Sequence, residues 1–260
     1  MNHIHAKEIN FSYSNETFLK NISLTIQAGK MISIIGPNGS GKSTLVKLLA
    51  ASILPQSGHV FLNELPILKM KRKELAKKIA YLSQSPVAPD DLTVRQLVQY
   101  GRYAHQSYFK NTKNNDENIV NWALQVTGLT NFAENCVFEL SGGQRQRAWI
   151  GMALAQNSQC LFLDELTTYL DIRHQIEILN LLKNINQEQK KTIVMVHHDL
   201  NHAIHYSEEI IVMADGKIKA FDKVQNILES KILNSVFNIE FKCFFDQNKR
   251  PILFYSHTVA

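Results

Sequence analysis

The stretch MISIIGPNGSGKSTLVKLLA, residues 31–50, decides the fold. Its first six residues form a short continuous apolar run, which is typical of a buried parallel strand. Apolar residues at helical spacing follow in the second half. Between them, GPNGSGKS fits the spacing G-x-x-x-x-G-K-[ST], whose glycines let backbone N–H groups converge on phosphate oxygens. The order strand, glycine loop, helix therefore predicts a nucleotide-binding α/β domain.

Each part of this loop has a predicted task. Lys42 would reach the β and γ phosphates, the Ser43 hydroxyl would ligate Mg²⁺, and Thr44 would hold the α-phosphate side. The N-terminus of the following helix adds positive potential. The alternative is a glycine turn that happens to precede a lysine, and the strand before it and helix after it argue against this. The predicted nucleotide-binding residues here are Gly36, Pro37, Asn38, Gly39, Ser40, Gly41, Lys42, Ser43 and Thr44.

A second apolar run, CLFLDE at 160–165, ends in two carboxylates. Ligand sites of α/β sheets form at the carboxyl ends of the strands. Asp164 would hold Mg²⁺ through water, and Glu165 would orient and deprotonate the water that attacks the γ-phosphate. The alternative is a strand end with surface acids. Two carboxylates with different tasks favour hydrolysis over simple nucleotide binding.

The run TIVMVHH at 192–198 brings histidines to another strand end. A metal site is one interpretation, because His198, His202 and His205 have the spacing of one helical face. No cysteine or second acidic cluster supports it. The alternatives are surface histidines or a γ-phosphate contact by His198.

Composition limits the class of protein. The chain has 260 residues, 45% of them hydrophobic and 20% charged, which suits one sizeable globular domain or a core with an inserted lobe. Its formal charge of +5 and pI near 9.0 suit nucleic acid, an acidic membrane surface or nucleotide phosphates as partners, and the alternative is a mildly basic soluble protein. Cys136, Cys160 and Cys243 have no CxxC spacing, so we expect neither a disulfide framework nor a zinc site. We expect the protein to reside in a reducing compartment. No apolar run approaches the about 18 residues that span a bilayer, so we expect any action at a membrane to take place outside the lipid.

The remaining patterns predict the organisation of the chain. Early alternating segments indicate strands, residues 91–158 have helical periodicity, and strands and helices alternate again from residue 160. We predict a nucleotide-binding α/β core from 1–87 and 159–225, a helical subdomain at 88–158, and a C-terminal extension at 226–260. Within the extension, FNIEFKCFFDQNKRPILFYS predicts a hairpin about its polar turn.

LSGGQRQR at 140–147 looks like a second phosphate loop, with a serine and two glycines ahead of a helix. One interpretation is a capping box, in which Ser141 caps the helix and Gln144 reaches back. Together with GPNGSGKST, the LSQ at 82–84, LFLDE, TTYLD at 167–171 and HD at 198–199, it makes the chain resemble the ATP-binding subunits of ABC transporters. The resemblance covers essentially the whole chain. LSGGQ shortly upstream of LFLDE is its most specific feature.

The resemblance implies a P-loop NTPase with a RecA-like, mainly parallel sheet, an N-terminal antiparallel β subdomain and an inserted helical subdomain. It also implies ATP and Mg²⁺ as ligands and a head-to-tail homodimer, in which the signature loop of one chain meets ATP on the other. That loop is Leu140, Ser141, Gly142, Gly143 and Gln144.

Other positions take roles by the same resemblance. Tyr13 would stack on adenine, with ordinary strand packing as the alternative. Gln84 would contact Mg²⁺ and the attacking water, and His198 would be the switch histidine. Leu170 and Asp171 would cross the dimer interface. One departure is Leu166, where proline is usual, and which leaves the loop after the acids less rigid. Arg145 and Arg147 would support the signature helix.

LTVRQLVQYGRYAH, TTYLDIRHQIEIL and VMVHHDLNHA look like the ATPases of iron(III)-siderophore, haem and cobalamin importers, especially the siderophore group. Such a subunit would sit peripherally on the cytoplasmic face of the cell membrane. Its partners would be two integral-membrane permease subunits and, indirectly, an extracytoplasmic substrate-binding protein, with no nucleic acid. The alternatives are a haem or cobalamin importer ATPase, or a soluble ABC ATPase without a transport role. A DNA-acting ATPase of this kind would carry long coiled coils, and no heptad run exists here.

Overall fold

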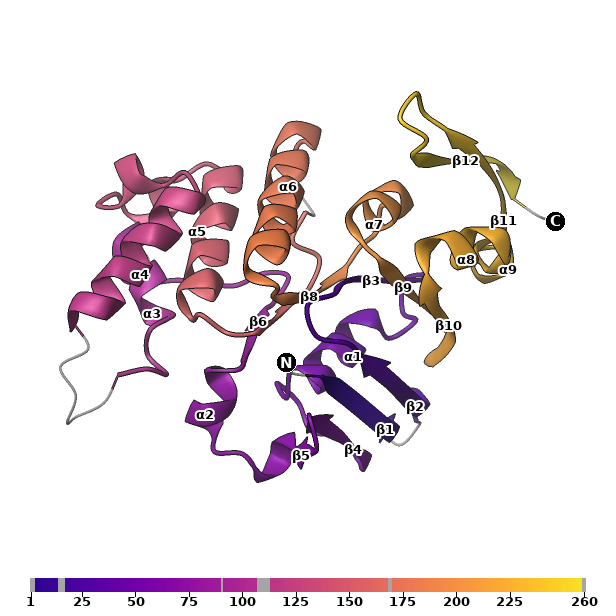
Figure 1. Cartoon of the computed structure of the whole chain (residues 1–260), viewed down its shortest axis with the longest axis horizontal. Helices are drawn as coiled ribbons and strands as arrows, with labels where there is room; N and C mark the ends of the chain where they lie inside the picture. The colour runs from indigo at the N-terminus through magenta and orange to yellow at the C-terminus, as the bar shows by residue number, and fades with distance from the viewer. Residues whose placement is uncertain (1–2, 14–16, 90, 107–112, 168–169, 259–260) are drawn as a thin grey trace. The chain divides into compact units, whose positions relative to one another are not determined.

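The computed structural model describes residues 3–13, 17–89, 91–106, 113–167 and 170–258. The chain forms two compact units (Figure 1). The first unit joins Met1–Lys69 to Thr192–Ala260, and the second is Met70–Lys191. Two residues of the TTYLD motif, Thr168 and Tyr169, lie outside the described residues. The domain boundaries expected from sequence stay a prediction.

An antiparallel sheet opens the first unit. Its strands are β1 (Ile4–Phe11), β2 (Leu19–Ile26), β4 (Ser57–Leu62) and β5 (Leu65–Pro66), in the order β2-β1-β4-β5. In β2 the buried positions are apolar and the exposed ones mostly polar, so the sheet turns one face toward the core. This confirms the predicted N-terminal antiparallel subdomain.

The strand before the phosphate loop is the most buried of the first unit's parallel strands. All five residues of β3 (Met31–Ile35) are buried, and β3 pairs in parallel with β8 (Thr192–Val196) on one side and β9 (Glu209–Ala214) on the other. β10 (Lys217–Lys223) pairs antiparallel with β9. Helix α1 (Lys42–Leu49) packs against β8, and α7 (Leu200–Tyr206) packs against β3. The apolar run at 31–36 is therefore the buried parallel strand that the sequence predicts.

The C-terminal part of the first unit consists of α8 (Val224–Glu229), α9 (Ile232–Phe237) and a hairpin of β11 (Ile239–Phe245) and β12 (Pro251–Thr258). The hairpin confirms the predicted one, with the polar turn between its strands. The Asn201 side chain of α7 donates to the Leu253 carbonyl at 3.2 Å and accepts from the Leu253 amide at 2.8 Å. The side-chain carboxamide of Asn201 thus makes the two hydrogen bonds to β12 that a neighbouring strand would make. These bonds connect the hairpin to α7.

The second unit contains two parallel strands and a helical bundle. Strand β6 (Ile79–Leu82) follows α2 (Arg72–Ala76) and pairs with β7 (Cys160–Leu163). The bundle comprises α3 (Val94–Tyr100), α4 (Lys113–Val126) and α5 (Gly142–Ala155), with short 3₁₀ turns at Thr130–Phe132 and Val137–Glu139, and α6 (Ile172–Gln189) follows β7. A Cβ at Gly101 would lie 2.1 Å from the Met152 carbonyl oxygen, so only glycine allows α3 to approach α5 this closely.

No described helix has both the length and the apolar character needed to cross a bilayer.

Candidate functional site

The phosphate loop folds around the amino group of its own lysine. Lys42 is buried, and its Nζ donates to the carbonyl oxygens of Gly36 at 2.9 Å and Pro37 at 3.0 Å. Gly36 has φ 153°, and a Cβ there would lie 2.1 Å from the Met213 carbonyl oxygen. Gly41, the N-cap of α1, has φ 100°. Both positions therefore require glycine, and the loop holds a positive charge at its centre.

Two further groups of this loop fit a phosphate ligand. The Ser40 hydroxyl is buried, and its oxygen has no hydrogen-bond partner among the described residues. A buried hydroxyl without a partner costs free energy that a ligand acceptor would recover. The helix dipole at the start of α1 adds positive potential. The residues present therefore suit a phosphate-bearing ligand such as ATP.

Tyr13 lies beside the loop, although it comes from the segment after β1. Its hydroxyl is 3.1 Å from the Thr44 hydroxyl oxygen, and its ring meets Phe11 edge-on at 4.8 Å. The side chain is 64% exposed, so most of its surface is open to a ligand. Its ring contacts with Phe11 and Phe18 are those of ordinary packing, the alternative interpretation. Stacking on adenine stays a prediction.

The two carboxylates follow β7 in the second unit and differ in environment. Asp164 is buried and its amide donates to the Leu82 carbonyl at 2.9 Å. Glu165 has φ 52°, a left-handed backbone that costs a non-glycine residue about 1–3 kcal/mol. The Gln84 amide, at the end of the neighbouring β6, donates to Glu165 Oε2 at 2.5 Å. Two residues predicted to act on one water are thus in direct contact.

Leu166 is buried, and this bears on the missing proline. Its side chain is among the core residues of the chain, so apolar packing restrains the loop where proline would restrain φ. The lower rigidity of the loop with leucine in place of proline stays a prediction.

The signature loop is a helix N-terminus with a complete capping box. Ser141 Oγ accepts from the Gln144 amide at 3.3 Å, and Gln144 Oε1 accepts from the Ser141 amide at 3.0 Å. Arg145 donates to the carbonyls of Phe138 and Leu140. Arg147 pairs with Glu177 of α6. These contacts confirm the capping box and the supporting role of both arginines. At Gly142, a Cβ would meet no atom within 4 Å.

The predicted interface loop ends at Asp171, the N-cap of α6. Asp171 Oδ1 accepts from the His174 amide at 2.9 Å, and Oδ2 accepts from His174 Nδ1 at 2.8 Å. These hydrogen bonds lower the pKa of the Asp171 carboxyl below its usual range. Gln175 donates to the Leu170 carbonyl at 2.9 Å. Sequence reasoning missed His174 and Gln175; the spacing of Asp171 three residues before His174 was the available signal.

The two histidines at the end of β8 have opposite environments. His198 is exposed, whereas His197 is 3% exposed and its Nε2 has no hydrogen-bond partner among the described residues. Asp199 caps α7 by accepting from the His202 amide at 2.9 Å. The described residues contain no group of three or more His, Cys, Asp or Glu side chains able to hold a metal ion, so the histidine metal site lacks support. The γ-phosphate contact of the exposed His198 stays a prediction.

Acid should destabilise the protein through His197. Burial lowers the pKa of His197 from 6.5 to about 3, so the unfolded chain takes up a proton first as the pH falls. The stability it contributes is complete above pH 6.5 and is lost as the pH falls toward 3. Between pH 6.5 and 5 we expect a loss of roughly 1.5 kcal/mol of unfolding free energy that His197→Phe abolishes and His59→Asn, at an exposed site, retains. Urea unfolding at both pH values measures it, and equal losses in native protein and His197→Phe would contradict it.

Comparisons with known proteins agree with this geometry. A family model described as "ABC transporter" matches residues 19–168. The iron(3+)-hydroxamate import ATP-binding protein FhuC of Bacillus subtilis is 42% identical over 253 residues, which cover 97% of this chain and 94% of that protein. The ferric enterobactin transport ATP-binding protein FepC of Escherichia coli is 41% identical over 236 residues, which cover 91% and 87%. The dimeric structure of the bacterial cassette MJ0796 matches with a TM-score of 0.75 at 31% identity, covering 85% and 98%.

Proposed function

The chain belongs to the ABC transporter family, and from this premise we propose that it is the ATP-hydrolysing subunit of an importer for an iron(III)-siderophore complex. The observation that supports this choice of cargo is the similarity, along more than nine-tenths of the chain, to two ATP-binding proteins named for iron-chelate uptake. One is named for a hydroxamate and the other for enterobactin. They support the iron chelate as the class of cargo without selecting its chemistry.

We propose the following division of labour in ATP hydrolysis. In the first unit, Lys42 and Ser40 bind phosphate oxygens and Tyr13 stacks on the adenine. Mg²⁺, when bound, neutralises charge on the phosphates, and Ser43, Gln84 and Asp164 keep their predicted roles as its direct or water-mediated ligands. In the second unit, Glu165 accepts the proton of the attacking water. The hydrogen bond from Gln84 to Glu165 Oε2 holds the carboxylate in place.

The signature loop acts on a second copy of the chain in this proposal. Its capping box uses the first amides of a 14-residue helix that has no acidic side chain in its first turn. The positive end of this helix dipole is therefore not neutralised by an acid of its own first turn, and it suits the γ-phosphate of ATP on the partner. The dimeric structure of the cassette MJ0796 supports the dimer itself.

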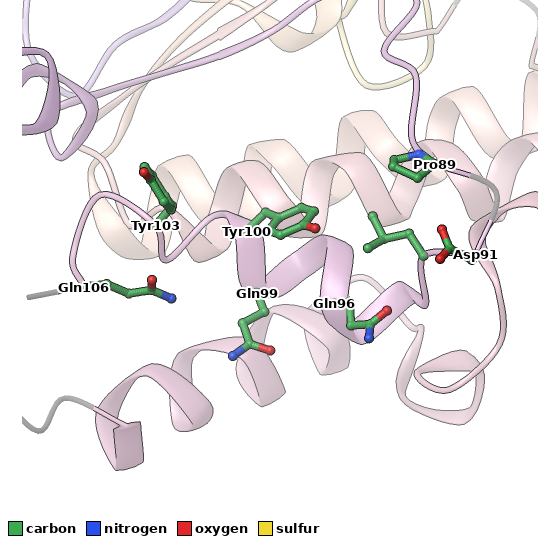
Figure 2. A pocket seen from close by; sticks show the side chains of 8 residues that line it. Pro89, Asp91, Gln96, Gln99, Tyr100, Tyr103 and Gln106 are labelled. Atoms are coloured by element: carbon green, nitrogen blue, oxygen red, sulfur yellow. The ribbon is translucent and has the colours of Figure 1, made fainter.

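A groove on the second unit suits a membrane permease. It has a volume of about 520 Å³ and is lined by side chains of α3 and of the segments on either side of it (Figure 2). Tyr100 and Tyr103 are 57% and 74% exposed there, and exposed aromatic side chains at a groove are typical of an interaction site. We propose that a helix of the permease docks in this groove, at the cytoplasmic face of the membrane. The lining side chains are Pro89, Asp91, Leu92, Gln96, Gln99, Tyr100, Tyr103 and Gln106.

Uptake of radioactive iron in source cells tests the function. Cells whose sole copy is the native chain or Glu165→Gln receive iron as hydroxamate siderophores, catecholate siderophores or haem. We expect the variant to lose uptake of one siderophore class, because transport then lacks hydrolysis. Glu240→Gln makes the same charge change at an exposed strand position and should transport normally. Unchanged uptake of every chelate in the Glu165→Gln cells would overturn the iron assignment.

A further inference from the structure

His174 connects the two segments that we propose to meet the partner subunit. It lies in the first turn of α6, where its amide and its Nδ1 each donate to one oxygen of the Asp171 carboxylate. Nδ1 therefore carries the proton, and both carboxylate oxygens point to one residue. The Asp171 carboxylate is 64% exposed and would otherwise rotate freely. A side chain with two hydrogen-bonded oxygens has one orientation instead of several.

The other face of the His174 ring lies against the signature loop. A Cβ built on Gly143 would be 2.8 Å from Cδ2 and 3.0 Å from Cγ of His174, well inside contact distance. Gly142, one residue earlier, has no atom within 4 Å of such a Cβ. The His174 ring therefore leaves no room for a side chain at Gly143, whereas a Cβ at Gly142 would meet no neighbouring atom. The ring sets the distance between the signature loop and the interface aspartate.

Neighbouring charges leave this contact undisturbed. Glu177, one turn further along α6, accepts from Arg173 at 2.9 Å and pairs with Arg147 of α5. That carboxylate is therefore engaged by two guanidinium groups, and Asp171 is the acid hydrogen-bonded to the imidazole. The Arg147–Glu177 pair also ties α5 to α6 one turn away from His174. The N-terminal parts of α5 and α6 are thus connected at two places, by the His174 ring against Gly143 and by the Arg147–Glu177 ion pair.

We propose that His174 is a positioning residue that holds Asp171 and the signature loop in one geometry, so that Asp171 crosses the dimer interface while the signature loop engages ATP on the partner subunit. This inference rests on the proposed dimer and deepens it. In this proposal His174 acts through Gly143 and Asp171, and not on the nucleotide of its own subunit or on the attacking water. Its loss should leave ATP binding to the phosphate loop of the same chain intact and weaken only the closing of two chains.

Three substitutions separate the two contacts of His174. His174→Asn keeps a donor near the place of Nδ1 and removes most of the ring that covers Gly143. His174→Phe keeps a ring and removes the donor. His174→Ala removes both. Each is made in the full chain carrying Glu165→Gln, and His59→Asn, at an exposed position in the first unit, is the matched control. ATP-driven dimer formation is followed by light scattering, and binding to a single subunit by the fluorescence of a labelled ATP.

We expect His174→Ala to raise the ATP concentration for half-maximal dimer by about thirtyfold, and the other two by about three- to tenfold, because a charge-assisted hydrogen bond is worth roughly tenfold or more. Single-subunit ATP affinity should stay within twofold of native. The inference would be overturned if His174→Ala formed the dimer at the native ATP concentration, or if His174→Asn or His174→Phe did so. It would also be overturned if ATP binding to a single subunit weakened in parallel with dimer formation. Absence of an ATP-driven dimer in the Glu165→Gln parent and in the control would instead count against the proposed dimer.

Discussion

Replacing Glu165 by glutamine is expected to lower the ATP turnover number by about 10²–10⁴-fold and leave ATP binding unchanged, because a positioned general base contributes a factor of this size. The substitution keeps the shape of the side chain. Its amide oxygen still accepts from Gln84, so the contact at the ends of β6 and β7 persists. What disappears is the ability of the side chain to accept a proton from water. Phosphate release by the purified transporter under saturating Mg-ATP measures the effect.

The matched control for this prediction is Glu240→Gln. Glu240 is an exposed residue of β11, so its substitution removes the same charge from the chain without touching the predicted site. The control should hydrolyse ATP at the native rate. A Glu165→Gln protein that retains more than a tenth of native turnover would remove Glu165 from the role of general base.

Replacing Lys42 by methionine is expected to weaken ATP binding by about 10²-fold or more, since charge-assisted hydrogen bonds to phosphate are each worth about 1.5–3 kcal/mol. Methionine keeps an unbranched apolar stem of similar length in the buried position. The Lys42 ammonium already rests on the Gly36 and Pro37 carbonyls, so its charge is placed before phosphate arrives and little rearrangement is needed. Equilibrium titration with a fluorescent ATP analogue gives the affinity directly.

Lys47→Met controls for the loss of one positive charge from α1. Lys47 lies in the last turn of the same helix and is only half-buried. We expect native affinity in this variant. Equal affinity of native protein and Lys42→Met, with the Lys47 control also unchanged, would mean that the phosphates bind elsewhere.

Much of the phosphate loop could be predicted from sequence because its geometry is local. The glycine spacing, the apolar strand before it and the helix after it all lie within 31–50, and the structure shows each. The same holds for the capping box of Ser141 and Gln144, whose partners are three residues apart. Local chemistry decides such features without knowledge of which elements become neighbours.

Contacts between distant segments could not be predicted in this way. The family resemblance assigns Gln84 and Glu165 to the same water, but their direct hydrogen bond depends on β6 and β7 being adjacent strands, and local sequence patterns do not give that order. The packing of His174 on Gly143 depends on where the N-termini of two helices meet. The sequence did place His197 and His198 at one strand end. Only the structure distinguishes the buried ring from the exposed one.

The division of the chain has a consequence for its synthesis. Both strands that flank β3 belong to the segment after Lys191, about 160 residues later than β3 itself. At translation rates of about 5–20 residues per second, this mostly apolar strand leaves the ribosome roughly 8–30 seconds before its neighbours exist. The second unit, by contrast, is one uninterrupted segment and can pack as soon as it emerges. The nascent chain therefore carries an unpaired aggregation-prone strand through most of its translation, and chaperone capture of β3 matters most in that interval.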